Sequence, residues 1–591
     1  MSKENQSQTK EQQKRTTYLK IINLMLFLIV PLVAFYISEL IWNPNVFQIP
    51  FVRILPNYMI LAGIQIGLFV ICNSFRITYS IILFSGYLYG LANYYVLLFK
   101  GNPLLPSDLL SYQTAMRVIS NYTFTVSTSI LRGTVILLLS LGIIYLAAFH
   151  NSKRNLKKLV QHVFLGFIWC ALFIKIITSI SWANFLNISL DVWQPENTYY
   201  ENGAVFSFLL ECQSMQVKKP VNYSAKIARR VLADYTDKEV FSDTSHPSVI
   251  IIMNESFSDL SIIGDIESDE YLANFNSIDN YIMRGNTYVS IHGGGTCNSE
   301  FEFLTGCSMG NFETTVYPYQ MYPLSQANSL AKTFSANGYK TVAIHPAPKD
   351  NWNRETVYQQ LGFDDFISLE DMEDVEYIRY YPSDAYNYKQ VISAYENADG
   401  PAFIFNVTMQ NHGGYSNLED LVNIEPVQVE EAFQEYEDVI TYMTLIRESD
   451  KAFKALLDYF SQVNEPVIIC MFGDHMPNLS MEFYETFLTQ EEINAGQQLT
   501  CTPYIIWSNY ETDINKIQKN TSLNYLGATI LDLTQIYTPY TGFLLDMQKS
   551  IPAVNVKGYQ TADGQWHTHT EPDILMDQYR CLQYYMLFDK H

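Results

Sequence analysis

Three side chains in the C-terminal half of the chain can hold a divalent cation. Glu255 follows the apolar run 249–253 with one residue, Asn254, in between, and the pair Asp474-His475 follows the apolar run 467–471. Carboxylate and imidazole groups form a mixed oxygen and nitrogen ligand set, which suits Mn²⁺, Mg²⁺ or Zn²⁺ better than a metal selected by thiolates. The pattern predicts that the ends of two strands bring these ligands together.

Thr296 is the candidate nucleophile. It follows the turn Gly293-Gly294-Gly295 and stands at the start of a predicted helix, where free backbone N–H groups and the helix dipole favour an anion. A metal ion on its hydroxyl would lower the pKa of that hydroxyl and expose an alkoxide to a phosphorus centre. The three glycines let the backbone approach phosphate oxygens closely. The pattern favours phosphoryl transfer to Thr296.

Each of these features is common on its own. An isolated glutamate after a strand is more often a surface residue or a helix cap, and Asp-His pairs and glycine-rich turns occur in many proteins. Their occurrence together, at the strand ends of one domain, favours a catalytic site.

Short apolar runs alternate with helical stretches through the C-terminal half, and the longest predicted helix covers about residues 430–460. This alternation predicts an α/β domain with a central, mainly parallel sheet covered on both faces, which we place at residues 246–591. In such sheets the functional residues collect at the carboxyl ends of the strands. The predicted strands are Val249–Met253, Thr287–Ile291, Lys340–Ile344, Ala402–Val407, Val467–Met471 and Pro503–Trp507.

The N-terminal part is different in character. It contains five apolar stretches, each about 18–25 residues long and so able to cross a hydrocarbon core of roughly 30 Å. They predict a five-helix transmembrane domain over residues 1–183, followed by a juxtamembrane linker over residues 184–245. The stretches are Ile21–Ser38, Ile54–Phe75, Ile77–Phe99, Gly133–Ser152 and about Leu159–Trp182.

Basic residues predict the orientation of these spans. They cluster in the N-terminal tail and between the fourth and fifth stretches, and the positive-inside rule places both segments in the cytoplasm. Five spans then bring the C-terminal domain to the outer face of a bacterial cell membrane. The basic residues concerned are Lys3, Lys10, Lys14, Arg15, Lys20, Lys153, Arg154, Lys157 and Lys158.

Charge divides the chain in the same way. Residues 1–200 carry 15 Lys and Arg against 6 Asp and Glu, whereas residues 201–591 carry 22 against 54, a net charge of −32. Nucleic acid is excluded as a partner of the acidic part, because phosphate neutralisation needs basic patches that this composition does not supply. The composition also excludes a disordered chain, collagen and a small disulfide scaffold.

These motifs resemble those of the lipoteichoic acid synthase family, which are membrane proteins with an extracellular sulfatase-like domain of the alkaline phosphatase superfamily. The resemblance covers nearly the whole chain. It implies Mn²⁺ bound by Glu255, Thr296, Asp474 and His475, with Thr296 as nucleophile. The motifs are Asn254-Glu255-Ser256, Gly295-Thr296 followed by Asn298-Ser299-Glu300-Phe301, His345, Trp352-Asn353-Arg354, Leu361-Gly362-Phe363, Asn411-His412 and Gly473-Asp474-His475-Met476-Pro477.

The resemblance also implies a pocket for the phosphoglycerol headgroup, lined by His345, Trp352, Arg354 and His412. Arg354 is able to clamp a phosphate, and His412 is able to donate to a glycerol hydroxyl or to protonate a departing alkoxide. For Trp352 and His345, core packing is the alternative interpretation.

The implied reaction moves glycerol phosphate from phosphatidylglycerol to a lipoteichoic acid, glycolipid or wall glycan acceptor through a phosphoglyceryl-threonine. Two positions depart from the family pattern. The best-known synthases have a Gly-Lys-Thr sequence where this chain has Gly294-Gly295-Thr296, and an acidic residue where it has Ala347. A single transfer onto a glycolipid or wall polysaccharide therefore stays open beside polymer formation.

Three other functions share parts of this pattern. Sulfate ester hydrolysis is disfavoured, because Cys297 is not followed by the Pro and Arg that formylglycine maturation needs. Phosphoethanolamine transferases share the membrane plan and a metal-bound threonine, although they usually have a disulfide-rich outer domain. They stay the enzymatic alternative, together with other metal-dependent phosphotransferases or phosphodiesterases of the same superfamily. A non-catalytic wall-binding or sensor module would have no need of a complete set of metal ligands and nucleophile.

Overall fold

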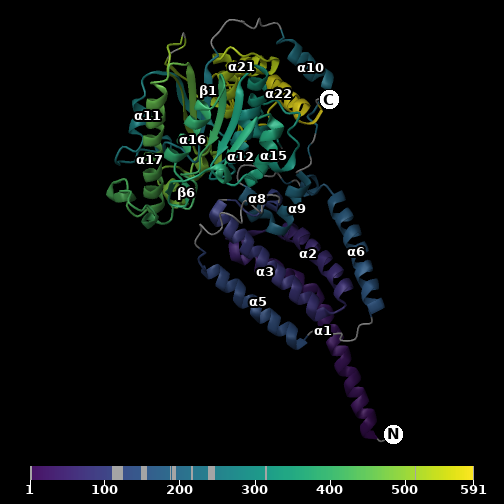
Figure 1. Ribbon diagram of the computed structural model, residues 1–591. Coiled ribbons are helices and arrows are strands. Elements are labelled where there is room, and N and C mark those ends of the chain that lie inside the picture. Colours follow the sequence, from purple (N-terminus) through teal and green to yellow (C-terminus); the bar gives the residue numbers. More distant parts are fainter. Residues whose placement is uncertain are drawn as a thin grey trace. The chain divides into compact units, whose positions relative to one another are not determined.

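A computed structural model describes residues 3–589 of the chain, apart from residues 101, 110–123, 148–155, 187, 189–194, 215–216, 218, 237–245, 313–315, 513 and 515. The chain forms two compact units, one drawn from residues 1–216 and the other mainly from residues 217–591 (Figure 1).

Five long helices dominate the first unit. Each includes an apolar segment of 20 to 26 residues, and at 1.5 Å per residue even the shortest is about 30 Å long. The five predicted spans are therefore confirmed as apolar helices, whereas the orientation-determining Lys153 and Arg154 lie outside the described residues. The helices are α1 Lys3–Trp42, α2 Phe51–Cys72, α3 Phe75–Lys100, α5 Thr128–Ala147 and α6 Leu156–Ser179.

Three short helices follow the spans within the described part of this unit: α7 (Trp182–Leu186), α8 (Pro195–Asn202) and α9 (Ala204–Ser214). The first N–H groups of a helix lack intrahelical partners, and side chains of α1 and α2 supply acceptors for α9. Ala204 N donates to Glu39 Oε1 at 2.8 Å, and Phe206 N donates to Asn57 Oδ1 at 2.8 Å. Helices α8 and α9 fall in the segment predicted as a linker.

The second unit is built on a nine-stranded sheet in the order β10-β2-β9-β8-β1-β7-β3-β4, with β11 beside β2. The strands from β8 to β4 are parallel, and β9 runs antiparallel to both of its neighbours. The predicted mainly parallel sheet is confirmed. Its strands are β1 Ser248–Asn254, β2 Tyr281–Tyr288, β3 Lys340–His345, β4 Asp365–Ser368, β7 Ala402–Val407, β8 Val467–Gly473, β9 Cys501–Ser508, β10 Ile517–Gln518 and β11 Thr521–Ser522.

Helices cover both faces of this sheet (Figure 1). On one side lie α11, α16 and α17, and on the other lie α12, α15, α21 and α22. Because β1 and β8 are buried along their whole length, their sequences are continuous apolar runs. The helices of this unit are α10 Ala225–Ala233, α11 Ala273–Ser277, α12 Thr296–Thr305, α13 Pro318–Met321, α14 Leu330–Ala336, α15 Arg354–Leu361, α16 Asp384–Glu396, α17 Glu437–Phe460, α18 Met481–Glu485, α19 Gln490–Ala495, α20 Leu523–Leu533, α21 Pro539–Ser550 and α22 Ile574–Tyr584.

Two smaller sheets accompany the main one. One has the order β12-β13-β14, and the other is the β5-β6 hairpin. Their strands are β5 Tyr377–Ile378, β6 Tyr381–Pro382, β12 Ala553–Asn555, β13 Gly558–Gln560 and β14 Trp566–His567.

Two predicted boundaries were wrong. The second strand covers Tyr281–Tyr288 instead of Thr287–Ile291, because this strand is only partly buried and carries polar residues along its middle. The long helix begins at Glu437 and not near residue 430, since residues 431–433 form a separate 3-10 turn.

Candidate active site

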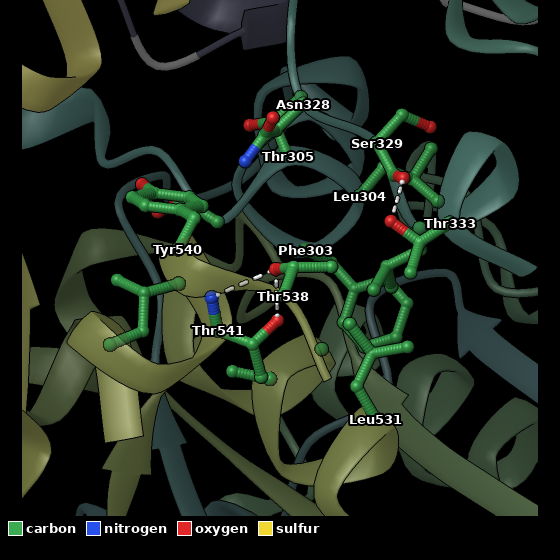
Figure 2. Close-up of a pocket in the computed structure, with 15 residues that line it drawn as sticks. Phe303, Leu304, Thr305, Asn328, Ser329, Thr333, Leu531, Thr538, Tyr540 and Thr541 are labelled. Atoms are coloured by element: carbon green, nitrogen blue, oxygen red, sulfur yellow. Dashed lines mark hydrogen bonds between the residues drawn. The ribbon is translucent and has the colours of Figure 1, made fainter. Parts of the chain in front are cut away.

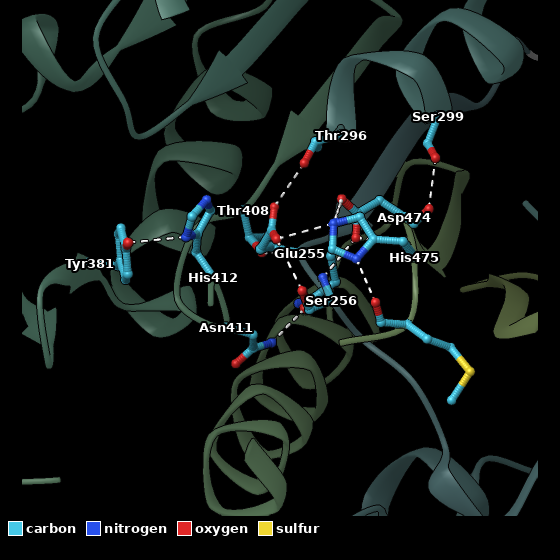
Figure 3. A network of polar contacts seen from close by, with 12 residues as sticks. Glu255, Ser256, Thr296, Ser299, Tyr381, Thr408, Asn411, His412, Asp474 and His475 are labelled. Atoms are coloured by element: carbon cyan, nitrogen blue, oxygen red, sulfur yellow. Dashed lines mark hydrogen bonds and ion pairs between the residues drawn. The ribbon is translucent and has the colours of Figure 1, made fainter. Parts of the chain in front are cut away.

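The predicted metal ligands converge at the carboxyl ends of two neighbouring strands (Figure 3). In the β1–β8 pair Asn254 lies opposite Gly473, so the residues that follow, Glu255 and Asp474, emerge side by side. Ligand atoms of Glu255, Asp474 and His475 all lie within 4.8 Å of one another. The three residues are at most 3% exposed.

The atoms of this cluster that could bind a metal ion face one another, and two of them have no hydrogen-bond partner among the described residues. His475 Nδ1 donates to the Met476 carbonyl at 2.8 Å, so the lone pair of the neutral ring is on Nε2. That Nε2 lies 3.3 Å from Asp474 Oδ2 and 3.5 Å from Glu255 Oε1. Within the described residues neither Nε2 nor Asp474 Oδ2 has a hydrogen-bond partner. Buried acceptor atoms that face one another without a shared proton fit a divalent cation.

The pKa values of Asp474 and His475 also favour a bound cation. Burial, and then the negative charge of Glu255, raise the pKa of Asp474 to about 7. Burial alone would lower the pKa of His475, but the carboxylates of Asp474 and Glu255 raise it. A bound cation offsets the repulsion between the carboxylates that raises the pKa of Asp474.

Thr296 is placed beside these ligands by the glycine-rich turn. It is the first residue of α12, it is 7% exposed, and its Oγ1 donates to Glu255 Oε2 at 3.2 Å. Gly295 precedes it with φ +91°, a left-handed conformation that favours glycine. The predicted nucleophile, the acceptor of its hydrogen bond and the amino end of a helix therefore meet at one point.

Backbone groups hold Asp474 in place. Its Oδ1 accepts from Ser256 N at 2.7 Å and from His475 N at 2.9 Å. Its carbonyl accepts from Ser299 Oγ at 2.7 Å, which links it to α12. These bonds leave Oδ2 as the oxygen that faces the metal ligands.

A buried polar network lies behind the site, and sequence reasoning missed it. Asp384, the first residue of α16, accepts on Oδ2 from Asn254 Nδ2 at 2.7 Å and from Ser449 Oγ at 2.6 Å. Asn411 Nδ2 donates to Asn254 Oδ1 at 2.9 Å and to Ser449 Oγ at 2.8 Å. The network thus ties the residue before Glu255 to the residue before His412.

His412 reaches the same site from the loop after β7. Its Nδ1 lies 3.0 Å from the hydroxyl of Tyr381, and in Figure 3 Tyr381 lies on the side of the imidazole ring away from Glu255. Burial lowers the pKa of His412, although the nearby charge of Glu255 acts in the opposite direction. Once protonated, such an imidazole gives up its proton readily.

Arg354 is committed to a carboxylate inside the domain. Its Nε and Nη2 donate to Glu300 Oε1 at 2.9 and 2.5 Å, and Tyr358 donates to Glu300 Oε2 at 2.7 Å. Arg354 is 2% exposed. Two of its five N–H groups donate to Glu300, and Nη1, 3.5 Å from the Asn351 carbonyl, is the one nitrogen of the guanidinium that does not bind this carboxylate.

His345 and Trp352 occupy contrasting environments. His345 is buried, its Nδ1 donates to the Val407 carbonyl at 3.1 Å, and burial together with the charge of Arg354 holds its pKa well below the usual value. Trp352 is half-buried, packs on Tyr317 with ring centroids 4.8 Å apart and has a left-handed φ of +55°. The ring of Tyr317 also lies near Gly295, 3.5 Å from the position that a Cβ would occupy there. This aromatic pair therefore lies beside the turn that precedes the nucleophile.

A pocket at the other end of α12 does not belong to this site (Figure 2). It lies around Phe303–Gly306 and has a volume of about 30 Å³, room for about one water molecule. Its hydroxyls are engaged locally, as when Thr538 Oγ1 accepts from Thr541 N at 3.1 Å. The pocket is a packing feature at the carboxyl end of the helix.

The sequence of this chain is similar to those of several known proteins. Residues 247–536 match the sequence profile of the family described as Sulfatase. The chain is 30% identical over 417 residues to a protein of Rhizobium meliloti (strain 1021) whose name proposes a role in cyclic β-1,2-glucan modification, a match covering 68% of this chain and 64% of that protein. The capsular polysaccharide biosynthesis protein RkpI of the same strain is 24% identical over 39% of this chain and 42% of its own length.

A solved structure shares the fold of the second unit. It is the phosphoglycerol transferase GacH of Streptococcus pyogenes in complex with sn-glycerol-1-phosphate, which is 24% identical, with a TM-score of 0.52 over 62% of this chain and 94% of that chain. The chain spans less than two thirds of the length of the two curated relatives above. The predicted α/β fold with a sulfatase-like domain is confirmed.

Proposed function

Residues 247–536 form a sulfatase-family domain, as the resemblance to lipoteichoic acid synthases implied, and from this premise we propose that the chain is a metal-dependent phosphoglycerol transferase. The donor is phosphatidylglycerol, and the acceptor is a hydroxyl of a glycan, a glycolipid or lipoteichoic acid. The observation that carries the proposal is the hydrogen bond from Thr296 Oγ1 to Glu255, because Glu255 belongs to the buried cluster with Asp474 and His475 that could bind a metal ion.

Glu255, Asp474 and His475, with the Thr296 hydroxyl, would hold the metal ion, which we propose to be Mn²⁺, with Mg²⁺ and Zn²⁺ as alternatives. A bound divalent cation supplies Lewis-acid polarisation of the phosphoryl oxygens and lowers the pKa of the Thr296 hydroxyl. The amino end of α12 presents backbone N–H groups to the same phosphoryl oxygens.

The transfer proceeds in two steps. Thr296 Oγ attacks phosphorus in line as its proton leaves toward Glu255, the bond from phosphorus to the diacylglycerol oxygen breaks, and His412 gives that oxygen a proton. In the second step His412 takes a proton from the acceptor hydroxyl, the acceptor oxygen attacks phosphorus, and Thr296 leaves and recovers its proton.

The remaining pocket residues bind the headgroup. Nη1 of Arg354 is the guanidinium nitrogen that we assign to the phosphate, and Trp352 and His345 line the glycerol side. The names of the relatives support a glycan acceptor, since they refer to β-1,2-glucan modification and capsular polysaccharide biosynthesis. We also propose that the N-terminus is cytoplasmic and that the catalytic domain faces the outside of the cell.

The test is diacylglycerol release from phosphatidylglycerol liposomes by the purified full chain with Mn²⁺. We expect Thr296→Ala to lower release by about 10³-fold or more, because no nucleophile remains, and Thr333→Ala, in the pocket at the far end of α12, to leave it unchanged. Metal content measured on both variants shows whether the ligand set survives. Release from phosphatidylethanolamine liposomes instead would indicate phosphoethanolamine transfer. Release that is unchanged in Thr296→Ala would exclude Thr296 as the nucleophile.

A further inference from the structure

The loop that carries His412 is fixed by a cation, the guanidinium of Arg379. Arg379 Nη2 donates to the His412 carbonyl at 2.8 Å, and its Nη1 donates to the Gly414 carbonyl at 2.9 Å. The Arg379 guanidinium also lies over the ring of Tyr415, 5.5 Å from its centroid. The backbone at His412 and Gly414 is thereby held, and the imidazole ring itself is oriented by its contacts with the Gly413 backbone and, at Nδ1, with Tyr381.

Nδ1 contacts a hydroxyl and not a carboxylate. The Tyr381 oxygen lies 3.0 Å from His412 Nδ1, the two rings have centroids 5.0 Å apart, and Tyr381 is 4% exposed. Tyr381 belongs to the two-residue strand β6, whose partner β5 leads directly into Arg379. One hairpin therefore supplies both the clamp on the loop and the partner of the ring.

A two-step transfer places a strict demand on His412. Its Nε2 must give a proton to the leaving oxygen in the first step and take one from the acceptor hydroxyl in the second. The ring cycles between imidazolium and the neutral form without passing through an imidazolate only if Nδ1 keeps its proton throughout. That requires an acceptor at Nδ1, and a hydroxyl oxygen is able to accept there in both states.

We propose that Tyr381 is the positioning residue of His412. Its hydroxyl oxygen accepts the Nδ1–H bond, fixes the tautomer and leaves Nε2 as the atom that exchanges a proton with leaving group and acceptor. As a neutral acceptor it holds the imidazolium less tightly than a carboxylate would, so proton release to an alkoxide costs less. This inference rests on the proposed phosphodiester transfer through Thr296.

The test varies the leaving group. Full-length protein with Mn²⁺ is assayed on a short-chain phosphatidylglycerol, whose alkoxide needs a proton to leave, and on the p-nitrophenyl diester of glycerol phosphate, whose phenolate leaves without one. We expect Tyr381→Phe to lower kcat/KM for the donor, which reports only the first step, about 10- to 100-fold on the first donor and less than about threefold on the second. Tyr415→Phe is the matched control, since its hydroxyl donates to the Asn411 carbonyl at 2.6 Å beside the same arginine, and we expect it to affect both donors equally.

A double-mutant cycle tests whether Tyr381 acts through His412. In the His412→Ala background, Tyr381→Phe should have no further effect on the alkyl donor. Equal losses on the two donors, or a full additional loss in that background, would overturn the assignment and leave a packing role. Absence of activity of the unmodified protein on both donors would instead overturn the phosphoglycerol transfer on which the inference rests.

Discussion

Glu302 is a buried carboxylate whose ionisation is unfavourable in the folded domain. Its Oε1 accepts from Ser290 Oγ at 2.7 Å, from Ser308 Oγ at 3.2 Å and from Met309 N at 2.7 Å, and no cation balances its charge in this set. Burial raises its pKa to about 7, although these hydrogen bonds act in the opposite direction. The residue links the segment before the glycine-rich turn to the segment after α12.

A pH dependence of stability follows from this raised pKa. The folded state holds the Glu302 proton up to about pH 7, whereas the unfolded chain loses it near the ordinary value, so stability falls as pH rises between the two. Glu302→Gln should remove this pH dependence. Its free energy of unfolding should therefore rise by about 1–3 kcal/mol relative to that of the unmodified protein as the pH increases between the two pKa values. The thermal unfolding midpoint of both proteins between pH 4.5 and 7.5 is the measurement. The exposed Glu485→Gln is the control, and parallel profiles for all three proteins would contradict the assignment.

The buried ion pair of Arg354 and Glu300 affects how variants of Arg354 must be interpreted. Both side chains are buried, at 2% and 0% exposure, so removing either partner leaves an uncompensated charge and is expected to destabilise the domain. Loss of activity in an Arg354 variant therefore does not by itself report on phosphate binding. Glu300→Gln, which leaves the guanidinium in place, separates the two effects.

The ligands were predictable from sequence because each follows an apolar strand and is chemically unusual there. Glu255, Thr296, Asp474 and His475 meet as expected. Tyr381 was not predictable: the chain has 43 tyrosines, and its strand of two residues leaves no periodic signal. Asp384 was missed because a carboxylate at the start of a helix already has a common explanation in the helix dipole.

Among the elements, α16 and α17 act as a common support for the two sides of the site. The Asp384 carboxylate accepts from Asn254, next to Glu255, and Ser449 bridges it to Asn411, next to His412. Partners of this kind orient the groups that touch a metal ion or substrate.

We expect Asp384→Asn to weaken Mn²⁺ binding about 10- to 100-fold, measured by calorimetric titration of the full chain. Asp450→Asn is the matched control. It removes a charge from the neighbouring position of α17, where Asp450 accepts from the N–H groups of Asn274 and Phe275 at 2.9 and 2.7 Å, and it should lower stability without changing affinity. Equal Mn²⁺ affinities in the two variants would reduce the network to a packing role.

Sequence periodicity located the elements of the central sheet and failed at its margin. Strands β1, β7 and β8 are fully buried, so their apolar runs are unambiguous. Strand β2 pairs with β9 on one side and with only two-residue strands on the other, and its middle residues face partly to solvent. A strand of that kind has no continuous apolar run to detect.

At the scale of the whole molecule, charge opposes the proposed substrate. Residues 201–591 carry a net charge of −32, and a field of that sign slows the approach of an anion. We expect kcat/KM for the p-nitrophenyl diester of glycerol phosphate to rise about two- to fivefold between 20 and 200 mM ionic strength, as salt screens the repulsion. The zwitterionic p-nitrophenyl diester of phosphoethanolamine should change less. A fall with salt for the anionic donor would mean that a locally positive pocket dominates.

If Glu255, Asp474 and His475 hold a metal ion as proposed, the fold also limits when the protein can acquire it. Glu255 and Asp474 belong to strands that are neighbours in space but far apart along the chain, so no stretch of newly made polypeptide presents the three ligands together. If the catalytic domain is exported as an unfolded chain, it crosses the membrane before β1 and β8 have paired, and it then has no assembled site to hold an ion. The ion then comes from outside the cell. Which metal is bound depends both on the affinity of the ligands for each metal and on the concentration of that metal outside the cell.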